Sequence, residues 1–423
     1  MSSPRRIAPL LIAGIAAAAL VAYLAVFAQL STDRRDGTDF TASYVAGQMW
    51  RDGQGGRLYD QGAEISRHNA EMPPGYRVDL PFITPPPSAL LAAAFTPLPI
   101  GSASVAGALL ELALVAAAVA LALRAVPRPP GRRHRETWIT GLVAAAGLGT
   151  YVMLLMGQWD GLCALALAGG YAALRRERPG TAGFVLAAGF AMTKPHLAIG
   201  LGLFLLGTRR PRAIAGAAAG VAAALALGVA VAGVRGWTDW LSTLSMSSDH
   251  SPLASLLGFT GFFGSWIGDT TTARVLAGVC SVAAALACAR LGDSVRRSPA
   301  HLEPALAGAV ALSLVAAPHL LLHDLAVLAP AAAWTLVWAA GNGRLRPAAL
   351  LWALLNLAAL ADLGNSASAP PGRLVPIALV AAGAAAWAVV VAPARTRSRV
   401  IAPAGARRYS GRGSGAGGVV DQS

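Results

Sequence analysis

Long runs of apolar residues recur along almost the whole chain, and they constrain its fold more than any other feature. A straight helix needs roughly 20 apolar residues to cross a bilayer, and about twelve runs reach or approach that length. They are residues 7–30, 102–125, 137–156, 158–174, 180–193, 195–208, 211–234, 273–291, 303–317, 319–340, 347–363 and 373–393. We therefore expect an all-α polytopic membrane protein with about twelve transmembrane or re-entrant helices.

Composition agrees with this class. Hydrophobic residues make up 55% of the chain and charged residues only 13%, about half of what a soluble domain carries. The net charge of +14 would suggest nucleic acid in a soluble protein, but inner loops of membrane proteins collect arginine. Without any nucleic-acid-binding signature, we expect membrane lipids and no nucleic acid as partners. Cys163, Cys280 and Cys288 all lie in apolar runs and are interpreted as packing residues.

The distribution of basic residues predicts the topology. If the N-terminus is cytoplasmic and the segments alternate, most of the 34 Arg and Lys residues fall on inner segments. This arrangement places both termini in the cytoplasm of a multi-pass plasma-membrane protein. A cleaved signal peptide is the alternative for the first run, but its length favours an uncleaved helix. We expect one membrane domain over residues 1–400, outer loops at 31–101 and 235–272, and a disordered cytoplasmic tail at 401–423.

Ionisable and polar residues gather at the predicted outer ends of the helices, where such groups usually mark function. Asp39 follows the first run by nine residues and could be a carboxylate general base; alternatively, Thr38 or Asp39 caps a short helix. The polar residues that gather there are Asp39, Gln158, Asp160, Lys194, His196, Asp249, His250, His319, His323 and Asp324.

Lys194 is the only lysine in the chain and lies between two short apolar runs, 180–193 and 195–208. A broken helix pair that points a cation and free backbone amides outward would suit an anionic phosphate. The alternative is a lysine that extends to the membrane interface with no further role.

Three other features remain open in the same way. His319 and His323 would share a face on a helix, which is compatible with phosphate binding, proton handling or a structural pair, and only weakly with zinc. Gln158 and Asp160 lie in a tight turn that could be merely polar. The run Phe82-Ile83-Thr84-Pro85-Pro86-Pro87 is interpreted as a rigid joint into the next helix.

Several of these landmarks, in order, resemble glycosyltransferase family 87 over about residues 37–335. They are Asp39-Phe40 with Tyr44, Leu58-Tyr59-Asp60, the Pro85-Pro86 pair, Gly157-Gln158, Lys194-Pro195 followed by Arg209-Arg210, and Ala317-Pro318-His319 with His323. The chain is thereby similar to the polyprenol-phosphate-mannose-dependent α-mannosyltransferases of actinobacteria, whose fold is the GT-C type. A composition rich in Ala, Gly and Arg indicates a GC-rich genome, as in actinobacteria.

The resemblance implies roles for single residues. Asp39 matches the catalytic aspartate of the first outer loop. Lys194, His319 and His323 match positions near the donor phosphate, and Tyr44, Gln158, Asp160, His196, Asp249 and His250 are the expected substrate-binding residues. The chain departs from the family in Thr84-Pro85-Pro86, where Tyr-Pro-Pro is usual, and in Asp249-His250-Ser251, where Asn-Gln-Ser is common. The second departure leaves the acceptor open.

The implied function is an inverting transfer of a sugar, with mannose first in line, from a polyprenyl-phosphate donor to a glycolipid or glycan acceptor at the outer face. One carboxylate base fits a single displacement, and no metal or other cofactor is expected. The alternatives are arabinofuranosyl transfer from a polyprenyl phosphate, a transporter or flippase for a lipid-linked or polar solute, and an inactive envelope scaffold. Polar groups at one face favour the enzyme over the transporter.

Overall fold

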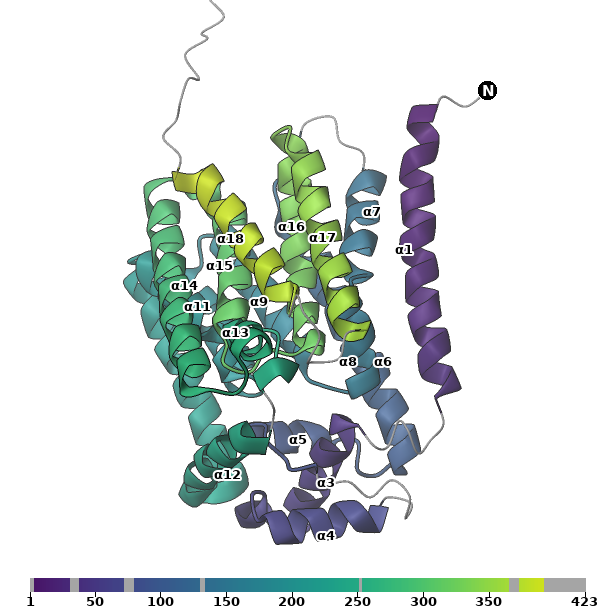
Figure 1. Cartoon of the computed structure of the whole chain (residues 1–423), viewed down its shortest axis with the longest axis vertical. Helices are drawn as coiled ribbons and strands as arrows, with labels where there is room; N and C mark the ends of the chain where they lie inside the picture. The colour runs from purple at the N-terminus through teal and green to yellow at the C-terminus, as the bar shows by residue number, and fades with distance from the viewer. Residues whose placement is uncertain are drawn as a thin grey trace, which may run out of the picture.

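The computed structural model describes residues 4–30, 38–71, 80–129, 134–250, 253–364 and 373–391, and within these ranges the chain is helical without strands. The helices form a long bundle with a small helical lobe at the end opposite the N-terminus (Figure 1). The predicted tail at 401–423 lies outside the described residues.

The helices of the bundle lie within a few residues of the predicted apolar runs. They are α1 (Pro4–Gln29), α6 (Ile100–Ala125), α7 (His134–Ala145), α8 (Leu148–Met156), α9 (Asp160–Arg175), α10 (Pro179–Ala191), α11 (Ile199–Gly207), the first part of α12 (Pro211–His250), α14 (Thr271–Arg297), α15 (Leu302–Ala316), α16 (Leu328–Gly341), α17 (Leu345–Gly364) and α18 (Val375–Val391). Short 3₁₀ turns precede α11 (η3, Pro195–Ala198) and α16 (η6, Leu322–Val327).

The sequence predicted about twelve transmembrane or re-entrant helices, several of them too short for a straight span. Seven helices of the described chain are long and apolar enough to cross a membrane, or eight if α7 and α8 count as one span bent by 51°. At this bend, Asn356 Oδ1 of α17 accepts the Leu148 N–H at 2.7 Å, where α8 begins. Three apolar helices are shorter: α10, α18 and the stretch Pro195–Gly207. The break predicted at Lys194-Pro195 is therefore confirmed.

Small residues bring the helices of the bundle into close contact. A Cβ on Gly183 of α10 would lie 2.0 Å from the Ala213 carbonyl of α12, and one on Gly207 of α11 would lie 1.9 Å from the Ala289 carbonyl of α14. Such close approach is characteristic of packing between membrane helices. Leucines such as Leu350, Leu354 and Leu357 on α17 are exposed instead, as expected for a lipid-facing surface.

The lobe consists of α3 (Asp39–Arg51), η1 (Gly55–Arg57), α4 (Gln61–Glu71), α5 (Pro87–Ala93) and the last part of α12. Its core contains Val45, Met49, Leu58, Phe82 and Trp240. The Tyr59 hydroxyl donates to the Thr84 carbonyl at 2.7 Å. The lobe therefore holds the proline-rich joint in place, and α5 begins at Pro87 as the sequence predicted.

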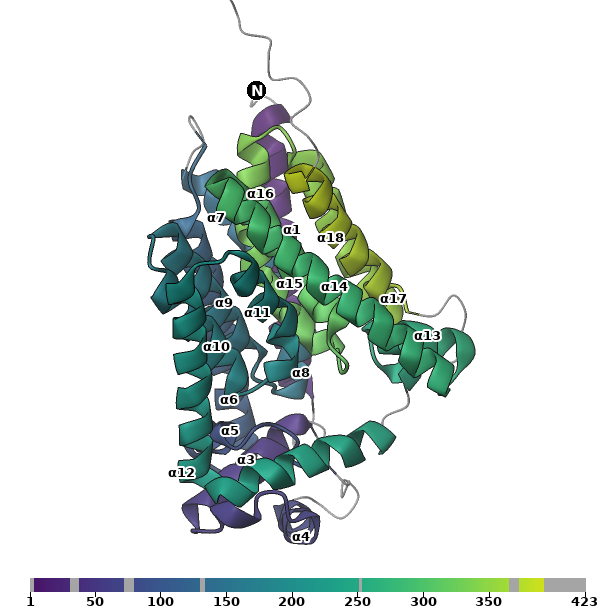
Figure 2. The ribbon, with the colours of Figure 1, turned by 90° about the vertical axis from the view of Figure 1, so that its left-hand side faces the viewer.

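Gly233 divides α12 into two helices, because its backbone angles (φ 71°, ψ 176°) are not helical. The first part runs along the bundle and the second part turns beneath it (Figure 2). Trp240 in the second part donates to the Ile83 carbonyl at 2.9 Å. Beyond it, α13 (Phe259–Ile267) carries the exposed aromatic residue Trp266.

Candidate functional site

A cavity of about 370 Å³ lies where the lobe meets the bundle, and we call it the polar cavity. Its walls come from the start of α3, the joint before α5, the turn between α8 and α9, the break between α10 and η3, the second part of α12, and the segment from α15 to η6. The predicted site residues among its lining are Asp39, Gln158, Lys194, His196, His319 and His323. Chain segments that are far apart in sequence thus converge, as expected from the predicted topology.

Asp39 is the first helical residue of α3, after the extended N-cap residue Thr38. Its Oδ2 accepts a hydrogen bond of 2.7 Å from Gln158 Nε2. Gly157 makes this pairing possible, because it closes α8 in the left-handed region (φ 66°) and a Cβ there would lie 2.5 Å from Phe40 Cβ. The motifs Asp39-Phe40 and Gly157-Gln158 therefore form one unit that fixes the carboxylate at the cavity wall.

Lys194 also lines the polar cavity and belongs to a buried cluster of four charged or titratable side chains, which we call the Lys194 cluster. Its Nζ is 2.8 Å from Asp160 Oδ1, 2.6 Å from Asp324 Oδ1 and 3.0 Å from His323 Nδ1. Asp160 is the first residue of α9, and Asp324 Oδ2 accepts the Leu321 N–H at the start of η6. The cluster therefore ties the break after α10 to the starts of α9 and η6.

The charges within the Lys194 cluster nearly cancel. Lys194 is only 4% exposed, and each of its three N–H groups has a protein acceptor within reach. His323 Nδ1 is also 3.0 Å from Asp160 Oδ2, so it donates there when protonated and accepts from Lys194 when bare. The alternative interpretation, a lysine that extends to the membrane interface, is wrong, because Lys194 is buried and pairs with two carboxylates. A phosphate could contact Lys194 directly only by replacing one of these acceptors.

The same cluster has the composition of a metal site. Ligand atoms of Asp160, His323 and Asp324 lie within 4.8 Å of one another. Lys194 Nζ already contacts both carboxylates. Its ammonium supplies the positive charge that a divalent cation would otherwise bring.

The two predicted histidines do not share a helical face. His319 lies in the irregular segment after α15, whereas His323 lies in η6. Pro318 and the extended Leu321 interrupt the helix that the spacing suggested. His319 faces His196 instead, with their ring centroids 6.5 Å apart. Burial lowers the pKa of His319, although Asp324 and Asp39 oppose this shift, so at neutral pH it is an uncharged hydrogen-bonding group.

Two of the predicted substrate-binding residues do not line the polar cavity, and the structure does not describe the side chains of two others. Tyr44 is buried outside the polar cavity, where its hydroxyl donates to the Leu98 carbonyl at 2.9 Å. Asp160 is fully buried behind the wall as a partner of Lys194. Asp249 and His250 end α12, and their side chains lie outside the described residues.

Other lining residues were not among the predicted site residues. Thr84, Trp240 and Arg274 contribute to the polar cavity, alongside Asp324, which was already among the polar residues expected at the outer helix ends. Arg274 pairs with Asp269 at 2.9 Å. Its position in the sequence could have marked Arg274 as a candidate, because it is one of few basic residues on the predicted outer segments.

The fold and the cavity together define a polytopic helical membrane protein with a carboxylate and several histidines at one end of its bundle. The sequence profile of glycosyltransferase family 87 matches residues 82–318. The chain belongs to this family of membrane glycosyltransferases, and so acts on a sugar donor and an acceptor. The matched region contains Gln158, Lys194 and His196, while Asp39 and His323 lie outside it. No curated protein and no solved structure matches the chain.

Proposed function

We propose that the protein transfers a sugar, with mannose as the first candidate, from a polyprenyl-phosphate donor to a glycolipid or glycan acceptor, with inversion at the anomeric carbon. The observation that carries the proposal is the position of Asp39. Its carboxylate is oriented by Gln158 and lines the same cavity of about 370 Å³ as Lys194, His319 and His323. The reaction takes place at the extracytoplasmic face of the plasma membrane, which is the side that the arginine distribution assigns to the lobe.

Asp39 is the proposed general base. It takes the proton of the acceptor hydroxyl as the oxygen bonds to the anomeric carbon and the bond to the donor phosphate breaks. Gln158 positions the carboxylate by donating to Oδ2, which leaves Oδ1 for the acceptor. A positioned base contributes roughly 10²–10⁴-fold to such a step.

The part of the wall formed by Lys194, His319 and His323 is the proposed site of the donor phosphate. Neutral His319 can donate one hydrogen bond to it, as can His323 Nε2, which has no hydrogen-bond partner among the described residues. Lys194 would join by exchanging one of its acceptors. The phosphate leaves as a stable anion, so hydrogen bonds from this wall can replace a general acid.

The test is sugar transfer by purified protein in liposomes, with labelled polyprenyl-phosphate-mannose as donor and a total lipid extract as acceptor pool. Asp39→Asn removes the base, because it replaces the carboxylate by an amide of the same shape. Asp60→Asn is the matched control, because Asp60 is an exposed lobe carboxylate paired with Arg57. We expect transfer by the parent and by the control, and a loss of at least about 100-fold in Asp39→Asn.

Equal transfer by Asp39→Asn and the parent would contradict the base assignment and leave Asp39 with a structural role. No transfer by the parent would contradict mannose, and polyprenyl-phosphate-arabinose would be the next donor. Movement of the lipid-linked sugar between leaflets without any product would favour a flippase instead.

A further inference from the structure

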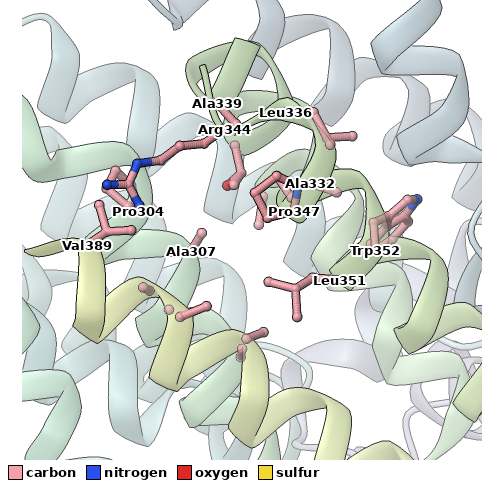
Figure 3. Close-up of a pocket in the computed structure, with 18 of the residues that line it drawn as sticks. Pro304, Ala307, Ala332, Leu336, Ala339, Arg344, Pro347, Leu351, Trp352 and Val389 are labelled. Carbon is pink, nitrogen blue, oxygen red and sulfur yellow. The ribbon is translucent and has the colours of Figure 1, made fainter. Parts of the chain in front are cut away.

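A second cavity of about 370 Å³ lies in the half of the bundle nearer the N-terminus, between α15, α16, α17 and α18 (Figure 3). We call it the apolar groove. Alanine, leucine, proline and tryptophan residues form nearly all of its lining, and no aspartate or glutamate contributes. None of its lining residues belongs to the polar cavity.

Arg344 provides the charge of this groove. It lies in the turn between α16 and α17, and its side chain points toward Pro304 of α15 and Val389 of α18 (Figure 3). Arg344 is exposed, and no described residue forms an ion pair with it. Deeper in the groove, the Thr335 hydroxyl is buried and has no hydrogen-bond partner among the described residues. The groove thus combines apolar walls with a free guanidinium at its rim.

Further arginines surround this end of the bundle. Arg124 ends α6, Arg175 ends α9, and Arg296 and Arg297 end α14. Each of these helices begins near the polar cavity, so its last turn lies at the opposite end. Arg175 pairs with Glu303, and Arg296 and Arg297 both pair with Asp293, so this end of the bundle keeps an excess of positive charge, which attracts anionic lipids.

We propose that the apolar groove binds an anionic glycerophospholipid, with part of one acyl chain between α15 and α18 and the phosphate against Arg344. The apolar lining requires a hydrocarbon occupant, and the unpaired guanidinium favours a phosphate, which arginine can bind through two hydrogen bonds. A polyprenyl-phosphate donor belongs to the other end of the bundle, at the polar cavity. This inference does not depend on the proposed sugar transfer.

The test is native mass spectrometry of the full-length protein, purified in detergent and incubated with equal amounts of dioleoylphosphatidylglycerol and dioleoylphosphatidylcholine. We expect one phosphatidylglycerol to remain bound to the parent in preference to phosphatidylcholine. Arg344→Gln should lower its retention about five- to tenfold. Arg346→Gln is the matched control, because Arg346 is also exposed, in the first turn of α17, but does not line the groove.

A second variant tests the walls. Ala307 lies at the groove surface of α15, so Ala307→Phe should fill the hydrocarbon site and lower phosphatidylglycerol retention to the level of phosphatidylcholine. Equal loss in Arg344→Gln and Arg346→Gln would overturn the proposal, as would equal retention of the two lipids by the parent. Polyprenyl phosphate displacing phosphatidylglycerol from the groove, or a dimer that covers it, would overturn it as well.

Discussion

The polar cavity and the apolar groove have the same volume, about 370 Å³ each, and opposite chemistry. In the polar cavity, Lys194 is buried and lies within hydrogen-bond distance of two carboxylates and an imidazole. In the groove, Arg344 is exposed and free of acidic neighbours. The reason is the cost of burying charge, which is large unless a partner accompanies it. The charges of a buried cluster therefore neutralise one another and fix the geometry of the site. An exposed charge at the rim of a groove remains available to a ligand.

The two regions share a structural element. His323 and Asp324 lie in η6, which continues directly into α16, and the first residue of α16, Leu328, lines the groove. A ligand in the groove would thus pack against α16, the helix that directly follows the η6 turn in the wall of the polar cavity.

The largest expected difference between the regions is in stability. Lys194→Met leaves Asp160 and Asp324 buried without their cation and should lower the free energy of unfolding by about 3–5 kcal/mol. Arg344→Met removes an exposed charge and should cost less than about 1 kcal/mol. Thermal unfolding in detergent, followed by tryptophan fluorescence, measures both. Similar losses in the two variants would contradict the contrast, and adding Asp160→Asn to Lys194→Met should recover part of the loss.

The next largest effect concerns turnover, which depends on the position of the Asp39 carboxylate in the polar cavity. Gly157→Ala places a Cβ against Phe40 and strains the backbone, so it should displace Asp39 from Gln158 and lower turnover about 100-fold. Gly53→Ala is the control, because Gly53 also has a positive φ (74°) but open space around it. It should lower stability slightly and leave turnover unchanged. Equal turnover in the two variants would show that the Gly157 contact does not position the base.

A smaller effect is expected from pH. The pKa of His319 is lowered from its usual 6.5 by burial. As the pH falls, the imidazole therefore becomes protonated in the unfolded chain before it does so in the folded protein. His319 should therefore cost no stability above about pH 6.5 and should destabilise the protein progressively below it. His323, Lys194, Asp324 and Asp39 all face this imidazole.

The comparison variant for this pH effect is His319→Gln, which should be less sensitive to acid than the parent when unfolding is measured at about pH 7.5 and 5.5. Phosphatidylglycerol retention in the groove should not change between these values, because the arginine guanidinium stays charged. An identical acid sensitivity of parent and variant would assign the effect to another group.

The smallest expected effect is that of chelation. Because the ammonium of Lys194 already neutralises Asp160 and Asp324, sugar transfer should be unchanged by EDTA. The assay compares EDTA-treated protein with the same sample after adding Mg²⁺ or Mn²⁺. Loss of activity that either ion restores would show that a cation enters the Lys194 cluster.

The sequence predicted most of the helices and the convergence of distant polar residues, because hydrophobic runs and arginine distribution depend on the bilayer rather than on tertiary detail. It did not predict which polar residues would satisfy one another. Lys194 was expected to be free, and only the packing of α9, α10 and η6 shows its two carboxylate partners. The spacing of His319 and His323 suggested a helix, but Pro318 and Leu321 break the pattern.

The bend between α7 and α8 was missed for a similar reason. At this bend, the backbone N–H of Leu148 pairs with the side chain of Asn356, more than 200 residues away in sequence. Tyr44 was expected to face substrate, but an aromatic residue in a lobe helix packs in the interior when its hydroxyl finds an acceptor, here the Leu98 carbonyl. Such partners are distant in sequence and cannot be predicted from the local sequence.

The short helix α13 has a consequence for kinetics. Thr260 at its start lines the polar cavity, while Trp266 and Ile267 near its end remain exposed, which suits a position at the lipid–water boundary. A lipid-anchored donor would then reach the polar cavity by lateral diffusion within the bilayer. Its effective concentration would be its mole fraction among the lipids, so dilution with inert phospholipid should slow the reaction, whereas dilution of the whole vesicle suspension with buffer should not.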